Sequence, residues 1–593
     1  MSADTIPARF FQHGRVRPDH PGYFVRESTG WKPTTFKAYN AQVRTAARAL
    51  MALGLKPGGT VCILGYNCPE WAILDLAAMA VGGVPAGIYT TCSPEEVQYI
   101  VHHAEASIML LEDEVQWEKV KARRPYLPKL KHVVMMRRAP AIHSERVLSW
   151  GEFLAKADGI DPKEVDRQVA ALEEDQPATF IYTSGTTGPP KAVVLSHRNL
   201  AWTARTLAEV MEVVSEDTVL SYLPLSHIAE QMATLHVPVT VGAQVYFAEA
   251  FAKVADNLKE VQPTVLFGVP RVWEKFHSAV EARLAQATGM RARLLAWAQD
   301  VGRRANAEQN AGRTASGLLG LQYALANRLV YARIRPMLGL GKVRLCISGA
   351  APISKEILEF FSGLDVVIRE IYGQSEDSGT TSFNVVGRTR FGTVGPAFPG
   401  VEVVIAEDGE ILARGPNIFL GYRKDEEATR EALSEGWLQS GDLGAFDEEG
   451  FLRVTGRKKD IIITAGGKNI TPRNIEEALQ GLDLVANAVV IGDRRKFLCA
   501  LLTLDEGAKR RFAAAHGLPE EGLHEHPDLI ATLQEGVDQV NARFARVENV
   551  RKFQVLPRDF SIEGGELTPT MKVKRQVVSE KHADLIKRMY ERG

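Results

Sequence analysis

Between residues 60 and 375, short β-branched runs alternate with helix-length amphipathic stretches, and this alternation narrows the choice of fold more than any other pattern in the chain. Short apolar runs separated by helical patterns are typical of parallel strands joined by crossover helices. The pattern therefore predicts an α/β body built on a parallel sheet. The runs that carry it are TVCIL (60–64), SIMLL (107–111), TFIYT (179–183), TVLFG (264–268) and VRLCIS (343–348).

The rest of the chain predicts a second domain. At 593 residues the chain exceeds the roughly 250–300 residues that one hydrophobic core supports. Closely spaced strands and glycine-rich turns between about 392 and 455 predict a β-rich subdomain. We expect a large N-terminal domain of residues 1–456 with stacked α/β sheets, and a small α+β C-terminal domain of residues 457–593. A stretch rich in Ala, Arg and Leu predicts helices between about 286 and 335.

Charge and cysteine content exclude several classes of protein. A net charge of -1 with a pI near 6.9 offers no global attraction for nucleic acid. The five cysteines are scattered and never spaced C-x-x-C, which argues against a disulfide scaffold and a zinc site and fits a reducing compartment. The most apolar window, 73–91, contains Asp75, Gly82, Gly83 and Pro85 and predicts a helix, a turn and a strand. With no signal peptide or membrane span expected, the chain is predicted to be cytoplasmic.

The most informative segment lies between two predicted strands and reads Tyr182-Thr-Ser-Gly-Thr-Thr-Gly-Pro-Pro-Lys191. Its glycines allow backbone N–H groups to turn toward an anion, its hydroxyls add donors, and its lysine neutralises charge. A Walker loop would instead read G-x4-G-K-S/T and open a helix, whereas a strand follows here. Taken alone, a segment of this kind is more often a polar hairpin than a phosphate site.

This segment resembles the signature loop of the adenylate-forming superfamily, which includes acyl-CoA synthetases, luciferases and peptide-synthetase adenylation domains. Further motifs follow in the family's order and spacing, and the resemblance covers nearly the whole chain. It implies that ATP is a substrate and that Thr186 is a catalytic hydroxyl. The residues that it assigns to the phosphates are Thr183, Ser184, Gly185, Thr186, Thr187, Gly188 and Lys191.

Two later segments, Ser348-Gly-Ala-Ala-Pro352 and Tyr372-Gly-Gln-Ser-Glu376, resemble the family's adenine site and end predicted strands. The resemblance implies that Tyr372 stacks on the base and that Glu376 holds the Mg²⁺ ion bridging ATP oxygens, a role suited to a hard oxygen ligand. Taken alone, a Tyr and a Glu at a strand end are more often surface residues. The other nucleotide-binding residues that it implies are Gly349, Ala350, Ala351, Gly373, Gln374 and Ser375.

Two motifs near residue 450 resemble the family's ribose site and hinge. The first ends at Asp442, and the resemblance implies a carboxylate at a tight turn that accepts hydrogen bonds from the ribose hydroxyls. An Asx turn is the plain alternative. The second reads Gly456-Arg-Lys-Lys-Asp460, so that Arg457 would also contact the ribose and Lys459 would occupy the hinge. Many relatives carry Asp at the hinge position.

The C-terminal segment Leu567-Thr-Pro-Thr-Met-Lys-Val-Lys-Arg575 resembles the motif whose lysine reaches the reacting carboxylate. The resemblance assigns that lysine to Lys572, with Lys574 as the alternative, because Met571 stands where relatives commonly have Gly. Just after the hinge, Gly466 and Gly467 would leave room for the pantetheine arm of coenzyme A.

These residue types suffice to join a carboxylate to the α-phosphate of ATP, because the reaction needs positioning and charge neutralisation rather than a nucleophilic side chain. In the family, the C-terminal domain then rotates about the hinge, and the thiol of coenzyme A attacks the mixed anhydride. The resemblance therefore implies an ATP- and Mg²⁺-dependent acid–thiol ligase that uses coenzyme A as co-substrate.

Two segments, 221–230 and 262–275, resemble long-chain fatty acyl-CoA synthetases, including the bubblegum type. The length of an acyl tunnel is not readable from sequence, because residues that line a tunnel and residues that fill a core look alike. His227 fits a gate and a core histidine equally well, and a residue such as Trp273 is more often a packing residue. The substrate-binding residues that the resemblance implies are His227, Phe267, Gly268 and Trp273.

Three other functions stay open at this point. They are a ligase for an aryl or shorter-chain acid, a non-catalytic fatty-acid uptake or binding protein, and a luciferase-like oxygenase. The presence of Glu376, Asp442, Arg457 and Lys572 argues against degraded catalysis. The basic stretches at 119–131 and 291–304 fit solvated helix faces better than a membrane surface, so peripheral contact with the inner membrane face and oligomerisation stay open.

Overall fold

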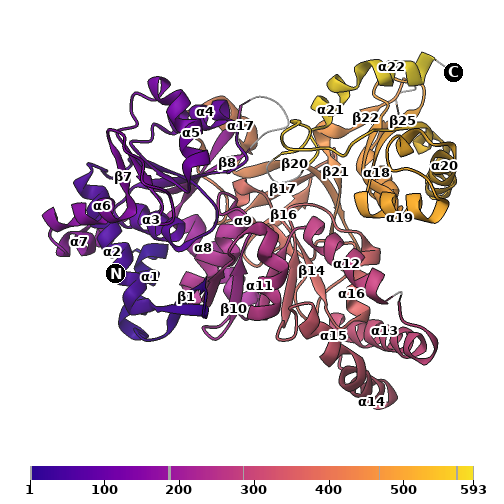
Figure 1. Cartoon of the computed structure of the whole chain (residues 1–593), viewed down its shortest axis with the longest axis horizontal. Coiled ribbons are helices and arrows are strands. Elements are labelled where there is room, and N and C mark those ends of the chain that lie inside the picture. Colours follow the sequence, from indigo (N-terminus) through magenta and orange to yellow (C-terminus); the bar gives the residue numbers. More distant parts are fainter. Residues whose placement is uncertain (1–2, 184–188, 285, 466–467, 569–571, 592–593) are drawn as a thin grey trace.

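The computed structural model describes residues 3–183, 189–284, 286–465, 468–568 and 572–591. Figure 1 shows a large body formed by the first three quarters of the chain, with the C-terminal segment beside it. No helix among these residues has both the length and the apolar character needed to cross a membrane.

An eight-stranded sheet forms the N-terminal part of the body, in the order β18-β9-β8-β4-β3-β5-β6-β7. The pairs from β8 to β7 are parallel, whereas β9 runs antiparallel to both β8 and β18. The strands are β3 (Thr60–Leu64), β4 (Val84–Ile88), β5 (Ile108–Leu111), β6 (His132–Met135), β7 (Val147–Ser149), β8 (Pro177–Thr183), β9 (Lys191–Ser196) and β18 (Gly421–Tyr422).

Both faces of this sheet are buried. Alternate side chains of a strand point to opposite faces, so Ile63 packs with one apolar cluster while its neighbours Cys62 and Leu64 pack with another. The uninterrupted apolar runs seen in the sequence follow from this two-sided burial. The covering helices include α2 (Phe36–Ala52), α3 (Pro69–Ala80), α4 (Pro94–Ala104), α5 (Glu114–Arg123), α6 (Trp150–Ala155), α7 (Lys163–Ala170) and α8 (His197–Val210), with α1 (Ile6–Val16) packed on α2.

Two four-stranded sheets follow, so the five runs recognised in the sequence divide between two sheets instead of forming one. Apolar composition marks a strand but not the sheet that it joins, so the runs alone predicted one parallel sheet, whereas the stacked α/β sheets expected for the N-terminal domain are confirmed. The first sheet, in the order β10-β11-β1-β2, consists of β1 (Pro21–Glu27), β2 (Gly30–Thr35), β10 (Thr218–Ser221) and β11 (Gln244–Phe247). The second consists of β12 (Val265–Gly268), β13 (Leu345–Ser348), β14 (Ile368–Tyr372) and β15 (Ser382–Phe383).

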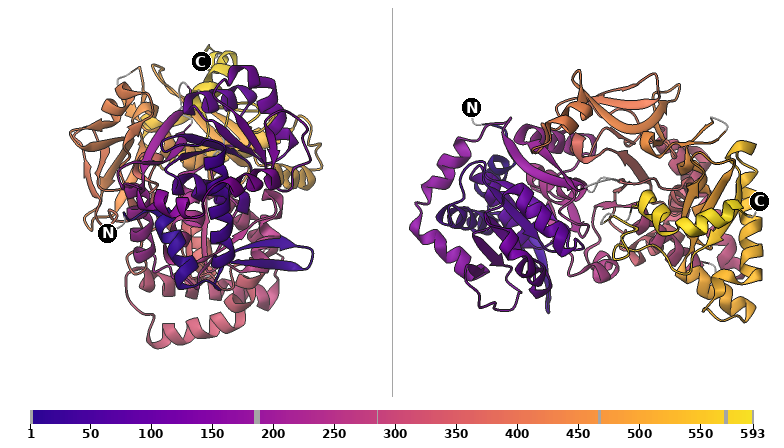
Figure 2. Two further views of the ribbon diagram at one scale, coloured as in Figure 1. Left: turned by 90° about the vertical axis from the view of Figure 1, so that its left-hand side faces the viewer. Right: turned by 90° about the horizontal axis from the view of Figure 1, so that it is seen from above.

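Helices connect these strands, and the helical character predicted for 286–335 is confirmed. There α13 (Gly289–Asn310) is followed by α14 (Gly317–Ala326), a π-helical turn (Asn327–Tyr331) and α15 (Ala332–Met337). Figures 1 and 2 show α13 and α14 projecting from one edge of the body. The other connections include α9 (Ile228–Gln231), α10 (Val237–Val241), α11 (Val254–Val261), α12 (Pro270–Leu284) and α16 (Lys355–Gly363).

A sheet of closely spaced strands occupies the region in which the sequence predicted a β-rich subdomain. Its order is β16-β17-β20-β19, and β21 also pairs with β20. Its strands are β16 (Glu402–Ile405), β17 (Glu410–Arg414), β19 (Leu433–Ser434), β20 (Trp437–Phe446) and β21 (Leu452–Arg457), and α17 (Glu426–Ala432) precedes β19.

The C-terminal segment has hydrophobic cores of its own, formed entirely by residues from Ile462 onward. Its mixture of strands and helices agrees with the expected α+β character. The strands are β22 (Ile462–Ile463), β23 (Asn469–Ile470), β24 (Val485–Ile491), β25 (Leu498–Leu504) and β26 (Val550–Val555), and the helices are α18 (Pro472–Gln480), α19 (Glu506–His516), α20 (Pro527–Asn541), α21 (Arg575–Lys581) and α22 (Ala583–Glu591).

Arg271 joins this segment to the body. From the first turn of α12, its Nη2 donates to the carbonyl of Ala486 at 3.1 Å and to Oδ1 of Asn487 at 2.6 Å. Asn487 is itself held by its Nδ2, which donates to Asp559 Oδ1 at 2.6 Å. The guanidinium therefore binds a pre-ordered edge of β24.

We predict that Arg271→Ala loosens this contact. The loss of hydrogen bonds from a charged donor, worth about 1–2 kcal/mol, should populate open orientations roughly five- to thirtyfold more. The measurement is the rate of limited trypsin cleavage at the exposed residues Arg457, Lys458 and Lys459. Arg283→Ala, at an exposed position on the same helix, is the control. Equal cleavage rates for the two variants would show that Arg271 does not hold the domains together.

Candidate active site

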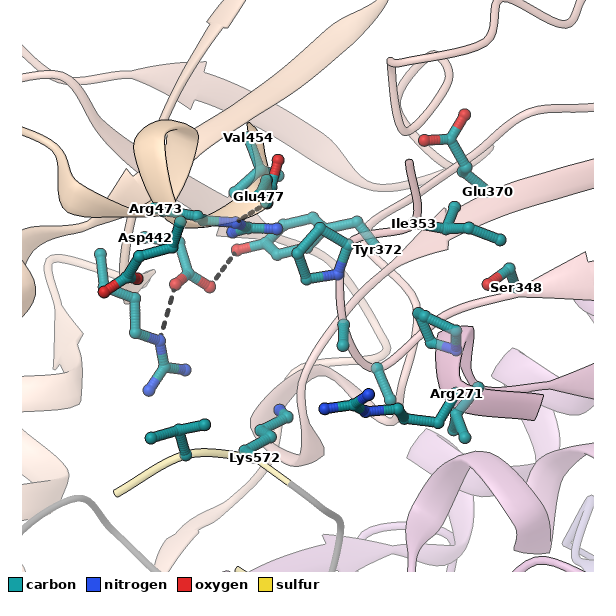
Figure 3. Close-up of a pocket in the computed structure, with 18 of the residues that line it drawn as sticks. Arg271, Ser348, Ile353, Glu370, Tyr372, Asp442, Val454, Arg473, Glu477 and Lys572 are labelled. Atoms are coloured by element: carbon teal, nitrogen blue, oxygen red, sulfur yellow. Dashed lines mark hydrogen bonds and ion pairs between the residues drawn. The ribbon is translucent and has the colours of Figure 1, made fainter. Parts of the chain in front are cut away.

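A cleft of about 2990 Å³ lies where the carboxyl ends of β12, β13 and β14 face β20, β21 and the C-terminal segment. In open sheets of parallel strands, ligands bind beyond the carboxyl ends of the strands. Figure 3 shows Ser348 and Tyr372 on the body side, with Lys572 opposite them on a separate stretch of chain. Residues far apart in the sequence thus line one cavity.

The carboxylate of Asp442 is the centre of the best-ordered polar cluster. Tyr372 Oη donates to its Oδ2 at 2.8 Å, and Arg457 Nε donates to its Oδ1 at 2.9 Å (Figure 3). Asp442 and Arg457 face each other directly in the β20–β21 pair. Asp442 therefore lies within a strand and not at the tight turn that the resemblance implied, although Gly441 before it has a left-handed φ of 70°.

The protonation states of this cluster follow from its burial. Burial, followed by repulsion from Asp442, raises the pKa of Tyr372, so the phenol stays a hydrogen-bond donor. The attraction of Asp442 raises the pKa of Arg457 and keeps the guanidinium charged. A neutral donor and a cation thus hold the carboxylate in one orientation, with lone pairs left for a ligand.

Glu376 lies one turn beyond Tyr372, in the 3-10 turn Ser375–Asp377. Tyr422 Oη donates to its Oε1 at 2.7 Å. The ring of Tyr422 also supports Lys191, whose Nζ lies 5.0 Å from the ring centroid and 3.8 Å from Asp425 Oδ2. Tyr422 thereby places the predicted metal ligand and the predicted phosphate lysine on one side of the cleft.

Two glycines in the predicted adenine site, Gly373 and Gly349, lie where the surrounding atoms leave no space for a side chain. A Cβ on Gly373 would lie 2.3 Å from the carbonyl carbon of Gly379, and a Cβ on Gly349 would lie 2.5 Å from Ile371 Cγ2. Ala350 has a left-handed φ of 68°. The hydroxyl of Ser348 is buried, lines the cleft and has no partner among the described residues. An unpaired buried hydroxyl beside strained backbone is typical of a site that awaits a polar ligand.

Lys572 lines the cleft together with Lys574, so geometry alone does not separate the two. The surrounding walls, followed by repulsion from Arg457, lower the pKa of Lys572 to about 8, although water reaches the side chain in the open cleft. His227 caps α9, and its Nδ1 accepts from the Ala229 N–H at 3.1 Å. Burial and the charge of Lys572 lower the pKa of His227 to about 4, so it is a neutral imidazole with the proton on Nε2.

The cleft continues into an apolar arm between α8, α10 and the strands β10 and β12. The arm is lined by buried side chains that come from separate elements, and His227 lines the same cavity. Such a wall has few groups able to bind a polar ligand and suits an alkyl chain. Its lining residues include Leu207, Met211, Val213, Val219, Met232, Val237 and Val265.

The structure brings most, but not all, of the predicted site residues to the cleft. Phe267 lines it, and so does Lys459 from the 3-10 turn Lys458–Asp460. Gly268, Gly349 and Trp273 are not among its lining residues. Trp273 is fully buried behind the wall, with its Nε1 3.3 Å from the carbonyls of Gly268 and Ile347, so it packs and does not line. The remaining lining residues from the prediction are Thr183, Lys191, Ala350, Ala351, Gly373, Gln374, Ser375 and Glu376.

Several predicted residues lie outside the part of the chain that the structure describes. The structure adds no information on their roles, which stay predictions. They are Ser184, Gly185, Thr186, Thr187, Gly188, Gly466 and Gly467.

Other cleft residues were missed by the sequence analysis. Glu370 is buried there with a pKa raised to about 8 by burial, and Arg473 pairs with Glu477 at 2.8 Å (Figure 3). Tyr422 and Arg271 were also missed. The sequence pattern contains no signal for contacts such as these, which depend on distant segments meeting.

The chain matches two family models. The model described as AMP-binding enzyme covers residues 10–423, and the one described as AMP-binding enzyme C-terminal domain covers residues 459–593. The long-chain-fatty-acid–CoA ligase ACSBG2 of Xenopus laevis is 37% identical over 99% of this chain and 84% of its own length. The long-chain-fatty-acid–CoA ligase FadD15 of Mycobacterium bovis is 38% identical over 99% of this chain and 97% of its own length.

Solved structures agree in fold. The adenylation domain of a carboxylate reductase from Mycobacterium chelonae superposes with a TM-score of 0.77 at 20% identity, over 99% of this chain and 91% of that one. An anthranilate CoA ligase in complex with anthranoyl-AMP superposes with a TM-score of 0.72 at 19% identity, over 97% of each chain. The predicted α/β architecture and the resemblance noted in the sequence are therefore confirmed, and the chain belongs to the AMP-binding enzyme family.

Proposed function

We propose that this enzyme activates a long-chain fatty acid with ATP, releasing pyrophosphate, and then transfers the acyl group from the acyl-adenylate to coenzyme A. The observation that carries the proposal is the apolar arm, which belongs to the same cavity as His227 and Lys572. An acid lying in this arm would present its carboxylate where the positive charge gathers. The names of the two curated relatives support the same substrate class.

The polar cluster would hold the nucleotide. Asp442 would accept from the ribose hydroxyls with the lone pairs that Tyr372 and Arg457 leave free. The ring of Tyr372 would stack on adenine, and the unpaired hydroxyl of Ser348 would find a partner in the ligand. The loop containing Thr186, with Lys191, would contact the phosphates, as its composition suggests.

The residues present fit Mg²⁺. The described residues contain no group of three or more acidic, His or Cys side chains able to cage a metal ion. Mg²⁺ is commonly bound instead by one or two carboxylates together with substrate phosphates. Glu376 would be that carboxylate, with Tyr422 orienting it through Oε1. When bound, the ion would neutralise phosphate charge.

The side chains would then act by position and charge. Adenylation brings the fatty carboxylate, an anion, against the α-phosphate, and a carboxylate oxygen forms the new P–O bond as pyrophosphate leaves. Lys572 would offset the charge on the reacting carboxylate and α-phosphate. His227 would donate from Nε2 to the carboxylate, since it is neutral and its Nδ1 is occupied. No side chain needs to form a covalent bond.

We place the hinge between the two domains at Lys459, within a turn that directly follows the ribose-side Arg457. Rotation there would withdraw Lys572 and bring Gly466 and Gly467 to the adenylate, opening a narrow path for the pantetheine thiol. The separate hydrophobic core that begins at Ile462 supports rotation of residues 457–593 as a unit.

A panel of acids tests the proposed substrate. We expect AMP release with coenzyme A to favour saturated acids of long chain over octanoate and benzoate. Val265→Phe, which narrows the apolar arm, should lower kcat/KM for palmitate at least roughly tenfold and leave octanoate little changed. Val261→Phe, an equally buried site away from the cleft, controls for overpacking. Preference of the unmodified enzyme for benzoate would instead identify an aryl-acid ligase.

The role of Lys572 is tested by separating the half-reactions. We expect Lys572→Ala to lower acid-dependent pyrophosphate exchange roughly 100- to 1,000-fold, because charge stabilisation at the reacting carboxylate is lost. Thioester formation from supplied acyl-adenylate should be largely spared. Lys574→Ala, the matched control from the same segment, should change neither rate greatly. An equal loss in both half-reactions by a folded Lys572→Ala enzyme would contradict the assignment.

The lowered pKa of Lys572 gives a pH prediction. A lysine whose pKa is lowered to about 8 is charged below that pH and loses its charge as pH rises through it. The kcat/KM for adenylation reports the free enzyme, so it should fall above about pH 8. Lys572→Arg keeps its charge and should remove this basic limb, whatever its absolute rate. A limb that persists unchanged in Lys572→Arg would belong to another group.

A further inference from the structure

The projecting helix α14 carries apolar side chains on its outer surface. Leu318 and Leu321 are each 72% exposed and Leu325 is 50% exposed. Their spacing of three and four residues places them on one face of the helix. They form a continuous outer stripe, which we call the leucine stripe.

The opposite face of α14 is already occupied, so the stripe is not a packing surface left over from the fold. Ala326 belongs to a small core with Ala298 and Val301 of α13, and Leu319 and Tyr323 pack against that core. Tyr331 closes the same core with a hydrogen bond from its hydroxyl to the carbonyl of Ala298. The leucine stripe faces away from all of these contacts.

The surroundings of the stripe are strongly basic. Residues 289–337 contain eight basic and two acidic side chains, a net charge of +6 in a chain whose total is -1. Both acids, Asp300 and Glu308, are paired with arginines. Arg328 lies three residues beyond Leu325. Arg328 and Arg333 are exposed and form no ion pair with a described residue.

We propose that the leucine stripe docks on an anionic lipid bilayer, with the leucines inserted at the interface and Arg328 and Arg333 against the headgroups. A helix with an exposed apolar face, followed along the chain by exposed arginines, offers both kinds of contact that such a surface binds. At ten residues α14 is too short to cross the bilayer, so the enzyme would rest on one leaflet. This inference rests on the proposed function only for its purpose, which is to draw an insoluble acid from the membrane.

A bilayer fits this surface better than a second copy of the chain. A homodimer would bring two segments of charge +6 face to face, and like charges at an interface repel. Anionic headgroups supply the opposite charge that the arginines lack. The positive charge of residues 289–337 therefore favours an anionic bilayer over a second copy of the chain.

Vesicle sedimentation tests the proposal with the full-length enzyme. We expect binding to phosphatidylcholine vesicles containing about a third phosphatidylserine, weakening as salt rises, and much weaker binding to phosphatidylcholine alone. Replacing Leu318, Leu321 and Leu325 together by Gln should lower the partition coefficient at least roughly tenfold. Arg328→Glu with Arg333→Glu should remove the preference for anionic vesicles.

The matched control replaces Val16, Val404 and Val547 by Gln, since these valines are exposed elsewhere on the molecule. Its binding should equal that of the unmodified enzyme. Equal binding by the leucine variant, or no binding by the unmodified enzyme, would overturn the proposal. So would light scattering that shows a dimer broken by the leucine variant without any vesicle binding.

Activity on two forms of substrate separates this inference from the proposed function. Turnover of soluble octanoate should be the same in the leucine variant and the unmodified enzyme, whereas turnover of palmitate presented in anionic vesicles should fall several-fold. If no acid is activated by any form while the vesicle-binding pattern holds, the proposed function fails and the docking surface stands.

Discussion

The pairing of Asp442 with Tyr372 and Arg457 is the interaction on which the cleft depends. It joins the end of β14 in the α/β body to two strands of the β-rich sheet, and Arg457 is the last residue of β21 before the turn at Lys458–Asp460. A ligand bound to Asp442 would therefore contact both the α/β body and the β-rich sheet, next to the proposed hinge at Lys459. Loss of this carboxylate would leave the Tyr372 hydroxyl and the Arg457 guanidinium without their shared partner, at a cost to folding as well as to binding.

Positive charge in the cleft would give the two proposed orientations of the C-terminal segment different energies. Lys572 and Arg457 repel each other across the cleft, and burial followed by this repulsion lowers the pKa of Lys572. Phosphate and carboxylate charges would relieve it, so substrates would favour the orientation that contains Lys572. Departure of pyrophosphate would remove part of this attraction. Arg271, bound to β24, would then make the contact that the rotating segment has to break.

The positions of single strands could be predicted from the sequence, because a strand that is buried on both faces has an uninterrupted apolar sequence. Thr60–Leu64 is an example. An apolar run does not show in which direction its strand runs or which strand it pairs with. The runs therefore could not predict that β9 is antiparallel or which strands share a sheet. Asp442 and Tyr372 were identified through motif spacing, whereas Tyr422 was missed because its partner Glu376 lies 46 residues away and is reached only through the fold. Trp273 carried the right motif but points into the core.

Whole-chain composition hid the surface feature of greatest interest. A net charge of -1 excludes a strongly basic protein, yet it averages over a projecting segment of charge +6. At physiological salt, screening limits the interaction between exposed charges to a distance of about 8 Å. A membrane would therefore be attracted by the charge of the local segment and not by the net charge of the whole chain. Basic residues alone, as at 119–131, are well explained by solvated helices. What distinguishes α14 is that its inner face is already packed while its outer leucines are exposed to water. No described part of the chain covers these leucines.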